Sequence, residues 1–140
     1  MYQTTNLSHI DAMKIISVVR EALEKENKGA AVAVVDAHGE LIAFLRTDGC
    51  RLPSINIAIN KAFTAARESS ESKSVGNRSR EEGFPMTNYG DPRYVSWGGG
   101  VPIRYEGKVI GGIGVSGLPE EEDMVLAQLG VDAISNRKPA

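Results

Sequence analysis

The sequence predicts an α+β fold in which helices pack on an antiparallel sheet. Its 140 residues suit one hydrophobic core. Two pairs of short apolar segments are each joined by a tight-turn sequence, and stretches of helical periodicity precede, separate and follow these pairs. We therefore expect the order α-β-β-α-loop-β-β-α in a single domain over residues 1–140.

The first helix is expected over Thr5–Gly29. Ser8, followed three residues later by Asp11, resembles a capping box. Apolar residues then recur at three- and four-residue spacing, which predicts one buried stripe: Ala12, Ile15, Ile16, Val19, Ala22 and Leu23. His9 is in register with this stripe, so we expect it at the edge of the core.

A β-hairpin is expected from Ala30–Asp36 and Leu41–Arg46. Both runs are apolar, and Asp36-Ala37-His38-Gly39 between them supplies Asp and Gly for a turn, with His38 solvated. Strands without alternation indicate a sheet covered on both faces. A second helix is expected from Pro53, and its buried face comprises Ile55, Ala58, Ile59, Ala62, Ala65 and Ala66.

The second half of the chain predicts a long connection, another hairpin and a last helix. Glycines and prolines interrupt the polar stretch Glu68–Arg93, so we expect an irregular segment with one short helical turn near its start at most. Tyr94–Tyr105 and Lys108–Ser116 predict the hairpin, turned at Glu106-Gly107. The helix is expected over Leu118–Asn136, with residues 136–140 frayed and with three residues facing the core: Val125, Leu129 and Ala133.

Composition excludes several classes of protein. The net charge is −2 and the 16 Lys and Arg residues are scattered, which argues against a nucleic-acid partner. No apolar run is long enough to span a membrane, and the N-terminus lacks the pattern of a signal peptide. The only cysteine, Cys50, cannot form an internal disulfide, which favours a cytoplasmic protein.

Two glycine clusters fall in the second hairpin. Gly112–Gly117 has the form G-x-G-x-x-G, but it begins inside a strand, precedes an acidic helix start and leaves too little chain for a dinucleotide-binding unit. Close approach of another backbone or a flat ligand is the favoured interpretation. Gly98-Gly99-Gly100 indicates either tight packing or access for a ligand, and both clusters are candidates for one shared surface.

Few side chains are candidates for chemistry. His9 is either a hydrogen-bonded structural residue or an axial ligand to a metal-bearing cofactor. Lys61, beside the apolar face of the second helix, is either a salt-bridge partner or an anion contact. Cys50 is interpreted as an ordinary thiol, and the acidic run Glu120–Asp123 is explained by the helix dipole. No metal-ligand spacing, nucleophile elbow or phosphate loop is present.

Four segments taken together resemble the GlcG/HbpS-like family, which includes the C-terminal domain of PduO-type proteins. In chain order they are Ala33–Leu41, Arg46–Gly49, Ile57–Ala66, and Gly98–Pro102 with Gly111–Gly117. The resemblance implies a profilin-like fold with a five-stranded antiparallel sheet, and homo-oligomers. It also implies a link to glycolate, propanediol or glycerol utilisation. The chain lacks the corrinoid adenosyltransferase domain of PduO-type proteins, so that activity is not implied.

The resemblance also implies a ligand, because some family members bind heme through a histidine near the start of the first helix. His9 is placed similarly and becomes the expected cofactor and metal ligand. Heme or another tetrapyrrole is then the expected partner, with Lys61 meeting a propionate and four glycines permitting close approach: Gly98, Gly99, Gly100 and Gly114.

Two other functions stay open. One is an enzyme acting on a small organic metabolite through Lys61, Asp48 or Cys50 in a pocket between subunits. The other is an assembly partner of a diol or glycerol dehydratase system. The polar segment Glu71–Glu82 departs from the more apolar segment of heme-binding relatives.

Overall fold

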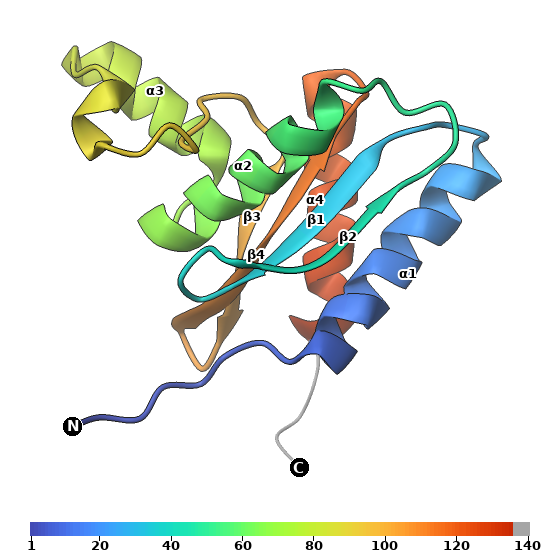
Figure 1. Cartoon of the computed structure of the whole chain (residues 1–140), viewed down its shortest axis with the longest axis horizontal. Coiled ribbons are helices and arrows are strands. Elements are labelled where there is room, and N and C mark those ends of the chain that lie inside the picture. Colours follow the sequence, from blue (N-terminus) through green and yellow to red (C-terminus); the bar gives the residue numbers. More distant parts are fainter. Residues whose placement is uncertain (136–140) are drawn as a thin grey trace.

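The computed structural model describes residues 1–135 and shows a four-stranded antiparallel sheet with helices on both faces (Figure 1). In chain order the elements are α1 (His9–Lys25), β1 (Ala31–Asp36), β2 (Leu41–Arg46), α2 (Ser54–Glu68), α3 (Ser72–Glu82), the 3-10 helix η1 (Met86–Tyr89), β3 (Gly100–Tyr105), β4 (Lys108–Ser116) and α4 (Glu120–Ser135). The predicted α+β class and both hairpins are confirmed.

The strand order is β2-β1-β4-β3, so the two hairpins join through β1 and β4 at the centre of the sheet. Ala31 is opposite Ser116 in this central pair, and Asp36 is opposite Gly111. The five strands implied by the family resemblance are wrong for the described residues, which form four. Strand β3 begins at Gly100 and not at Tyr94, because Gly99 with φ of +121° turns the chain there.

The side chains of β1 alternate between two apolar layers. Val32 and Val34 pack in one layer with residues of α1 and α4, whereas Ala33 and Val35 pack in the other with alanines of α2. Figure 1 shows α2 crossing the front of the sheet, α4 passing behind it and α1 beside β2, and residues of α1 and α4 belong to the same apolar layer. The expectation of a sheet covered on both faces is confirmed.

Helix α1 is shorter than the predicted Thr5–Gly29. The Ser8 side chain accepts a hydrogen bond from the Asp11 amide and caps the helix, so the helix begins at His9. The predicted apolar stripe is buried apart from Ala22, which is half-buried. His9 is exposed, so its expected place at the edge of the core is wrong; it precedes the first buried stripe residue by nearly a full turn.

The irregular segment predicted over Glu68–Arg93 contains an 11-residue helix, α3, and the short helix η1. Only three residues of α3 are buried: Ser72, Val75 and Gly76. A side chain at Gly76 would meet the carbonyl of Ser96, so glycine lets this polar helix contact the following loop. In Figure 1, α3 stands away from the sheet beyond the end of α2.

Helix α4 is rotated relative to the prediction. Val125, Leu129 and Ala133 are exposed, whereas the buried stripe contains a charged residue and a glycine: Asp123, Ala127, Gly130 and Val131. Hydrophobic periodicity misassigned the face because the buried positions are not all apolar. The predicted helix end at Asn136 and the frayed residues 136–140 lie outside the described residues.

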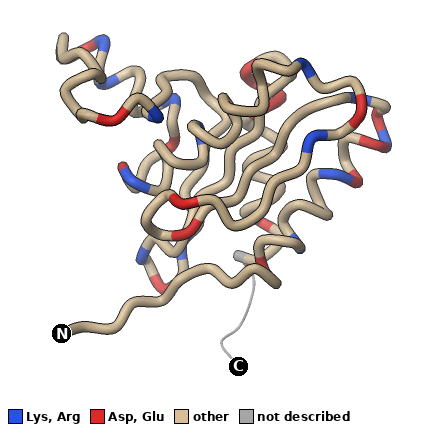
Figure 2. The backbone as a smooth tube through the Cα atoms, in the orientation of Figure 1, with Lys and Arg blue, Asp and Glu red and all other residues tan. Residues whose placement is uncertain are grey.

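Over the described residues, Figure 2 shows acidic and basic positions scattered over several elements, and the acidic run at the start of α4 is the exception. Of the helices in the described range, none is long and apolar enough to cross a membrane.

Candidate functional site

A cleft of about 750 Å³ lies where the start of α2, the end of β4 and the start of α4 meet. Its walls combine two cations, two serines, the only tryptophan of the sequence and a buried acid: Arg51, Lys61, Ser54, Ser116, Trp97 and Asp123. Of the predicted site residues, Lys61 lines this cleft and the Gly98–Gly100 cluster follows directly on Trp97.

Lys61 and Asp123 form a buried ion pair. Their side chains are 3% and 4% exposed, and Lys61 Nζ lies 3.1 Å from Asp123 Oδ2. Nζ also donates to the carbonyl oxygen of Val115 at 2.9 Å. Burial lowers the pKa of Lys61 and raises the pKa of Asp123, while the attraction between the two charges opposes both changes. Of the two interpretations left open for Lys61, the structure shows the salt bridge.

The acidic run at the start of α4 does more than complement the helix dipole. Asp123 Oδ1 accepts a hydrogen bond from the Leu118 amide at 3.1 Å, which fixes the approach to the helix. Glu120 accepts from the Gly98 amide at 2.7 Å and from Lys73 Nζ at 3.0 Å, and these bonds lower its pKa. Neither role of Glu120 and Asp123 is predicted from the sequence. The one available signal was the four-residue spacing of Asp123 from buried Ala127.

The two glycine clusters pack mainly against α2, and Gly98 packs against α4. A side chain at Gly114 would meet the carbonyl oxygen of Ala58, and one at Gly100 would meet that of Lys61. A Cβ at Gly99 would lie 2.9 Å from Lys61 Nζ, and one at Gly98 would lie 2.7 Å from Met124 Sδ. Glycine is therefore explained here by the close approach of backbone and buried side chains.

His9 lies at the other end of the sheet. The amide of Leu7 donates to the carbonyl of Ile110 near the start of β4, whereas Lys61 contacts Val115 near its end. Five residues of strand separate the two by about 17 Å. Figure 1 shows the start of α1 at the bottom of the view and the start of α4 at the top. Within one chain the structure does not bring His9 to Lys61 or the glycines.

The remaining candidates do not line the cleft. Cys50 is a half-buried free thiol whose pKa burial raises, so the reactive thiolate is disfavoured. Asp48 is exposed in the loop before it, and His38 is exposed in the first hairpin turn as expected. No group of three or more His, Cys, Asp and Glu side chains suitable for a metal ion occurs within the described part of the chain.

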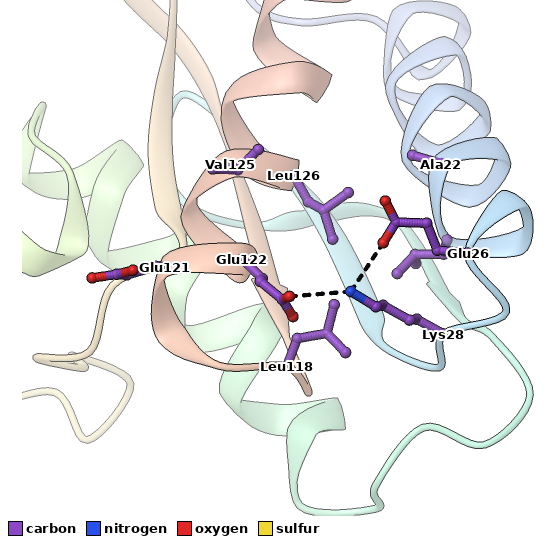
Figure 3. Close-up of a pocket in the computed structure, with 9 residues that line it drawn as sticks. Ala22, Glu26, Lys28, Leu118, Glu121, Glu122, Val125 and Leu126 are labelled. Atoms are coloured by element: carbon purple, nitrogen blue, oxygen red, sulfur yellow. Dashed lines mark hydrogen bonds and ion pairs between the residues drawn. The ribbon is translucent and has the colours of Figure 1, made fainter.

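A second, smaller groove of about 350 Å³ lies between the end of α1 and the start of α4. In Figure 3 Lys28 reaches across it to Glu26 and Glu122, at 2.9 and 3.1 Å, and its nitrogen lies between the apolar side chains of Leu126 above and Leu118 below. Lys28, Glu26 and Glu122 are therefore already paired with each other at the surface.

The fold and the cleft define the class of protein: an α+β domain whose two hairpins form one sheet between helices around a buried lysine–aspartate pair. The chain belongs to the HbpS-like family, described as haem degrading protein HbpS-like, whose model matches residues 7–132. The resemblance drawn from the four sequence segments is thereby confirmed.

Relatives known by sequence cover most of the chain. An uncharacterized 15.0 kDa protein in the dhaT-dhaS intergenic region of Citrobacter freundii is 32% identical, over 95% of each chain. Protein GlcG of Escherichia coli is 36% identical over 79% of this chain and 81% of its own. The corrinoid adenosyltransferase PduO of Salmonella typhimurium is 28% identical over 92% of this chain, which corresponds to 39% of PduO.

Solved structures share the fold. Klebsiella pneumoniae protein ORFY superposes with a TM-score of 0.91 at 25% identity, covering 99% of this chain and 97% of its own. HbpS superposes with a TM-score of 0.87 at 31% identity, covering 97% of this chain and 95% of its own. A PduOC:heme complex gives 0.85 at 27% identity, covering 94% and 96%.

Proposed function

We propose that this protein binds heme or a related tetrapyrrole as an accessory protein, with His9 as the axial ligand. The observation that carries the proposal is an exposed imidazole at the first residue of α1, in a fold that superposes on a heme complex with a TM-score of 0.85. No hydrogen bond or ion pair joins this imidazole to another described residue. A ring nitrogen is therefore free to bind iron.

The surroundings of His9 fit such a group. Met13, one turn further along α1, is 53% exposed, and Ile10 is 59% exposed. A shallow depression of about 430 Å³ continues from Met13 past Val18 to Ala133 of α4. These side chains offer apolar surface to a macrocycle, which when bound would supply the iron chemistry.

A cation for a propionate is also present on this face. Lys14 lines the same depression and has no ion-pair partner among the described residues, whereas Lys61 lies at the far end of β4 and is paired with Asp123. Lys14 therefore replaces Lys61 in the proposal. The depression is open to solvent, so a second copy of the chain would have to cover the outer side of the ligand, which supports a homo-oligomer.

The test is a visible-absorption titration of the purified protein with hemin, comparing wild type with His9→Ala. His38→Ala is the matched control, because His9 and His38 are the only histidines in the sequence and both are exposed. We expect a saturable Soret shift that disappears in His9→Ala and persists in His38→Ala. An unchanged spectrum in His9→Ala rejects the ligand assignment, and a featureless wild-type titration rejects the heme proposal.

We further propose that this binding serves glycerol, propanediol or glycolate utilisation in the cytoplasm. The names of the relatives GlcG and PduO support this. A role as an assembly partner of an enzyme in such a system remains the second candidate. It is favoured if the protein fails to bind hemin yet co-purifies with subunits of one defined enzyme.

A further inference from the structure

The cleft beside Lys61 contains unused hydrogen-bond donors, whereas its carboxylates are already paired. Both of its acids are occupied: Asp123 by Lys61 and the Leu118 amide, and Glu120 by Lys73 and the Gly98 amide. The basic side chains of the cleft, in contrast, still have hydrogen-bond donors without a partner. Lys61 uses two of its three N–H donors, on Asp123 and Val115. A ligand that binds in this cleft must therefore accept hydrogen bonds.

Arg51 lines the same cleft, and all the N–H donors of its guanidinium can bind a ligand. The side chain is exposed, and no hydrogen bond or ion pair joins its guanidinium to another residue in the described range. The planar donor fork of arginine matches the two oxygens of a carboxylate. Because the acids nearby are already neutralised by partners, an anion entering here meets an unpaired positive charge.

Two buried serine residues line the walls of the cleft. Ser54, at the start of α2, is 6% exposed, and Ser116, at the end of β4, is 5% exposed. Neither side chain hydrogen-bonds to another described residue, and within the described range no fully enclosed polar side-chain atom lacks a partner. Neither hydroxyl oxygen is therefore fully enclosed, and because both residues line the cleft, both hydroxyls are candidates to bind a ligand there.

We propose that this cleft binds a small organic carboxylate carrying a second oxygen function, such as a 2-hydroxy acid. Arg51 holds the carboxylate, while the third Lys61 donor and the hydroxyls of Ser54 and Ser116 hold the hydroxyl or carbonyl oxygen. The indole of Trp97 and the side chain of Ile57 supply apolar walls for a short carbon chain. This site is separate from the His9 surface and stands whether or not heme binds there.

The test uses the fluorescence of Trp97, the only tryptophan in the sequence, which lines the cleft and is 59% exposed. The purified full chain is titrated with three probes: lactate, propane-1,2-diol and inorganic phosphate. The diol keeps the carbon skeleton of lactate and the hydroxyl but lacks the carboxylate. We expect a saturable change with lactate, confirmed by calorimetry, and much weaker responses with the diol and with phosphate.

Variants separate the site from general charge attraction. Arg51→Gln should weaken lactate binding at least about tenfold, because a charge-assisted hydrogen-bond pair is lost. Ser116→Ala should weaken it several-fold. Arg46→Gln is the matched control, since Arg46 is also exposed but does not line the cleft, and it should bind as wild type. Melting curves establish that each variant is folded.

Three results would overturn the inference. If lactate causes no saturable change in fluorescence or heat, the proposed carboxylate site is rejected. A diol or phosphate that binds as tightly as lactate rejects the carboxylate. Equal weakening by Arg46→Gln and Arg51→Gln rejects the assigned contact. The failure of the heme proposal is visible independently, because hemin binding by Arg51→Gln should equal that of wild type.

Discussion

Replacing Lys61 by Met tests how much the buried ion pair matters to stability. The substitution keeps an unbranched side chain of similar length but leaves Asp123, which is 4% exposed, without its partner charge. Breaking a buried pair in this way costs about 3–5 kcal/mol, because an uncompensated charge stays in the interior. Against a typical net stability of about 5–15 kcal/mol, the melting temperature should fall by roughly 15 °C.

The assay is urea unfolding followed by circular dichroism, applied to a double-mutant cycle with Asp123→Asn. Asparagine keeps an oxygen that can accept from the Leu118 amide but removes the charge. The double variant should therefore recover to within about 2 kcal/mol of wild type. Arg20→Met is the control, because the Arg20–Glu24 pair is 41% and 58% exposed and should contribute no more than about 0.5 kcal/mol.

Either of two results would refute this reasoning. The first is a loss in Lys61→Met no larger than in Arg20→Met, which would mean that the lysine is hydrated. The second is a double variant as unstable as the sum of the single variants, which would mean that the two charges do not interact.

Two further predictions concern packing and pH. Gly114→Ala should lower the free energy of unfolding by about 3 kcal/mol, because the methyl group would meet the backbone of Ala58. Gly83→Ala should lower it by only about 1 kcal/mol, because Gly83 has φ of +69° but open space around it; thermal or urea unfolding measures both. Equal losses would contradict the packing argument. The lowered pKa of Glu120 means that its stabilising effect is complete above the ordinary value of 4.5 and is lost as pH falls through the lower folded value. Melting temperatures should therefore drop less on acidification in Glu120→Gln, and an equal drop would count against the Gly98 contact.

Much of the fold was predictable because local patterns agree with it. The two hairpins are apolar runs around turn residues, and the stripe on α1 has the helical period. Helix α3 was not predictable, since it buries little and depends on distant partners. Ser72 Oγ donates to the carbonyl of Trp97 and accepts from the amide of Gly100, bonds that no local pattern reveals.

The sequence predicted the basic residue of the cleft, Lys61, but not its acidic partner, Asp123. Lys61 was conspicuous as a charge beside an apolar helix face. Asp123 was hidden in an acidic run whose position at a helix start already has a sufficient explanation in the dipole. Only the tertiary fold turns that one carboxylate inward, and the same fold exposes Val125 and Leu129, which apolar spacing had assigned to the core.

The pairing of β1 with β4 has a consequence for synthesis on the ribosome. Lys61 and Asp123 are 62 positions apart, and the central strand pair joins Ala31 to Ser116. Residues 31–61 therefore emerge with an unmatched lysine and an open β1 edge, and neither is satisfied until residues 116–123 have been translated. Completion of this fold is consequently a late event, which leaves the nascent β1 edge exposed to pairing with other chains.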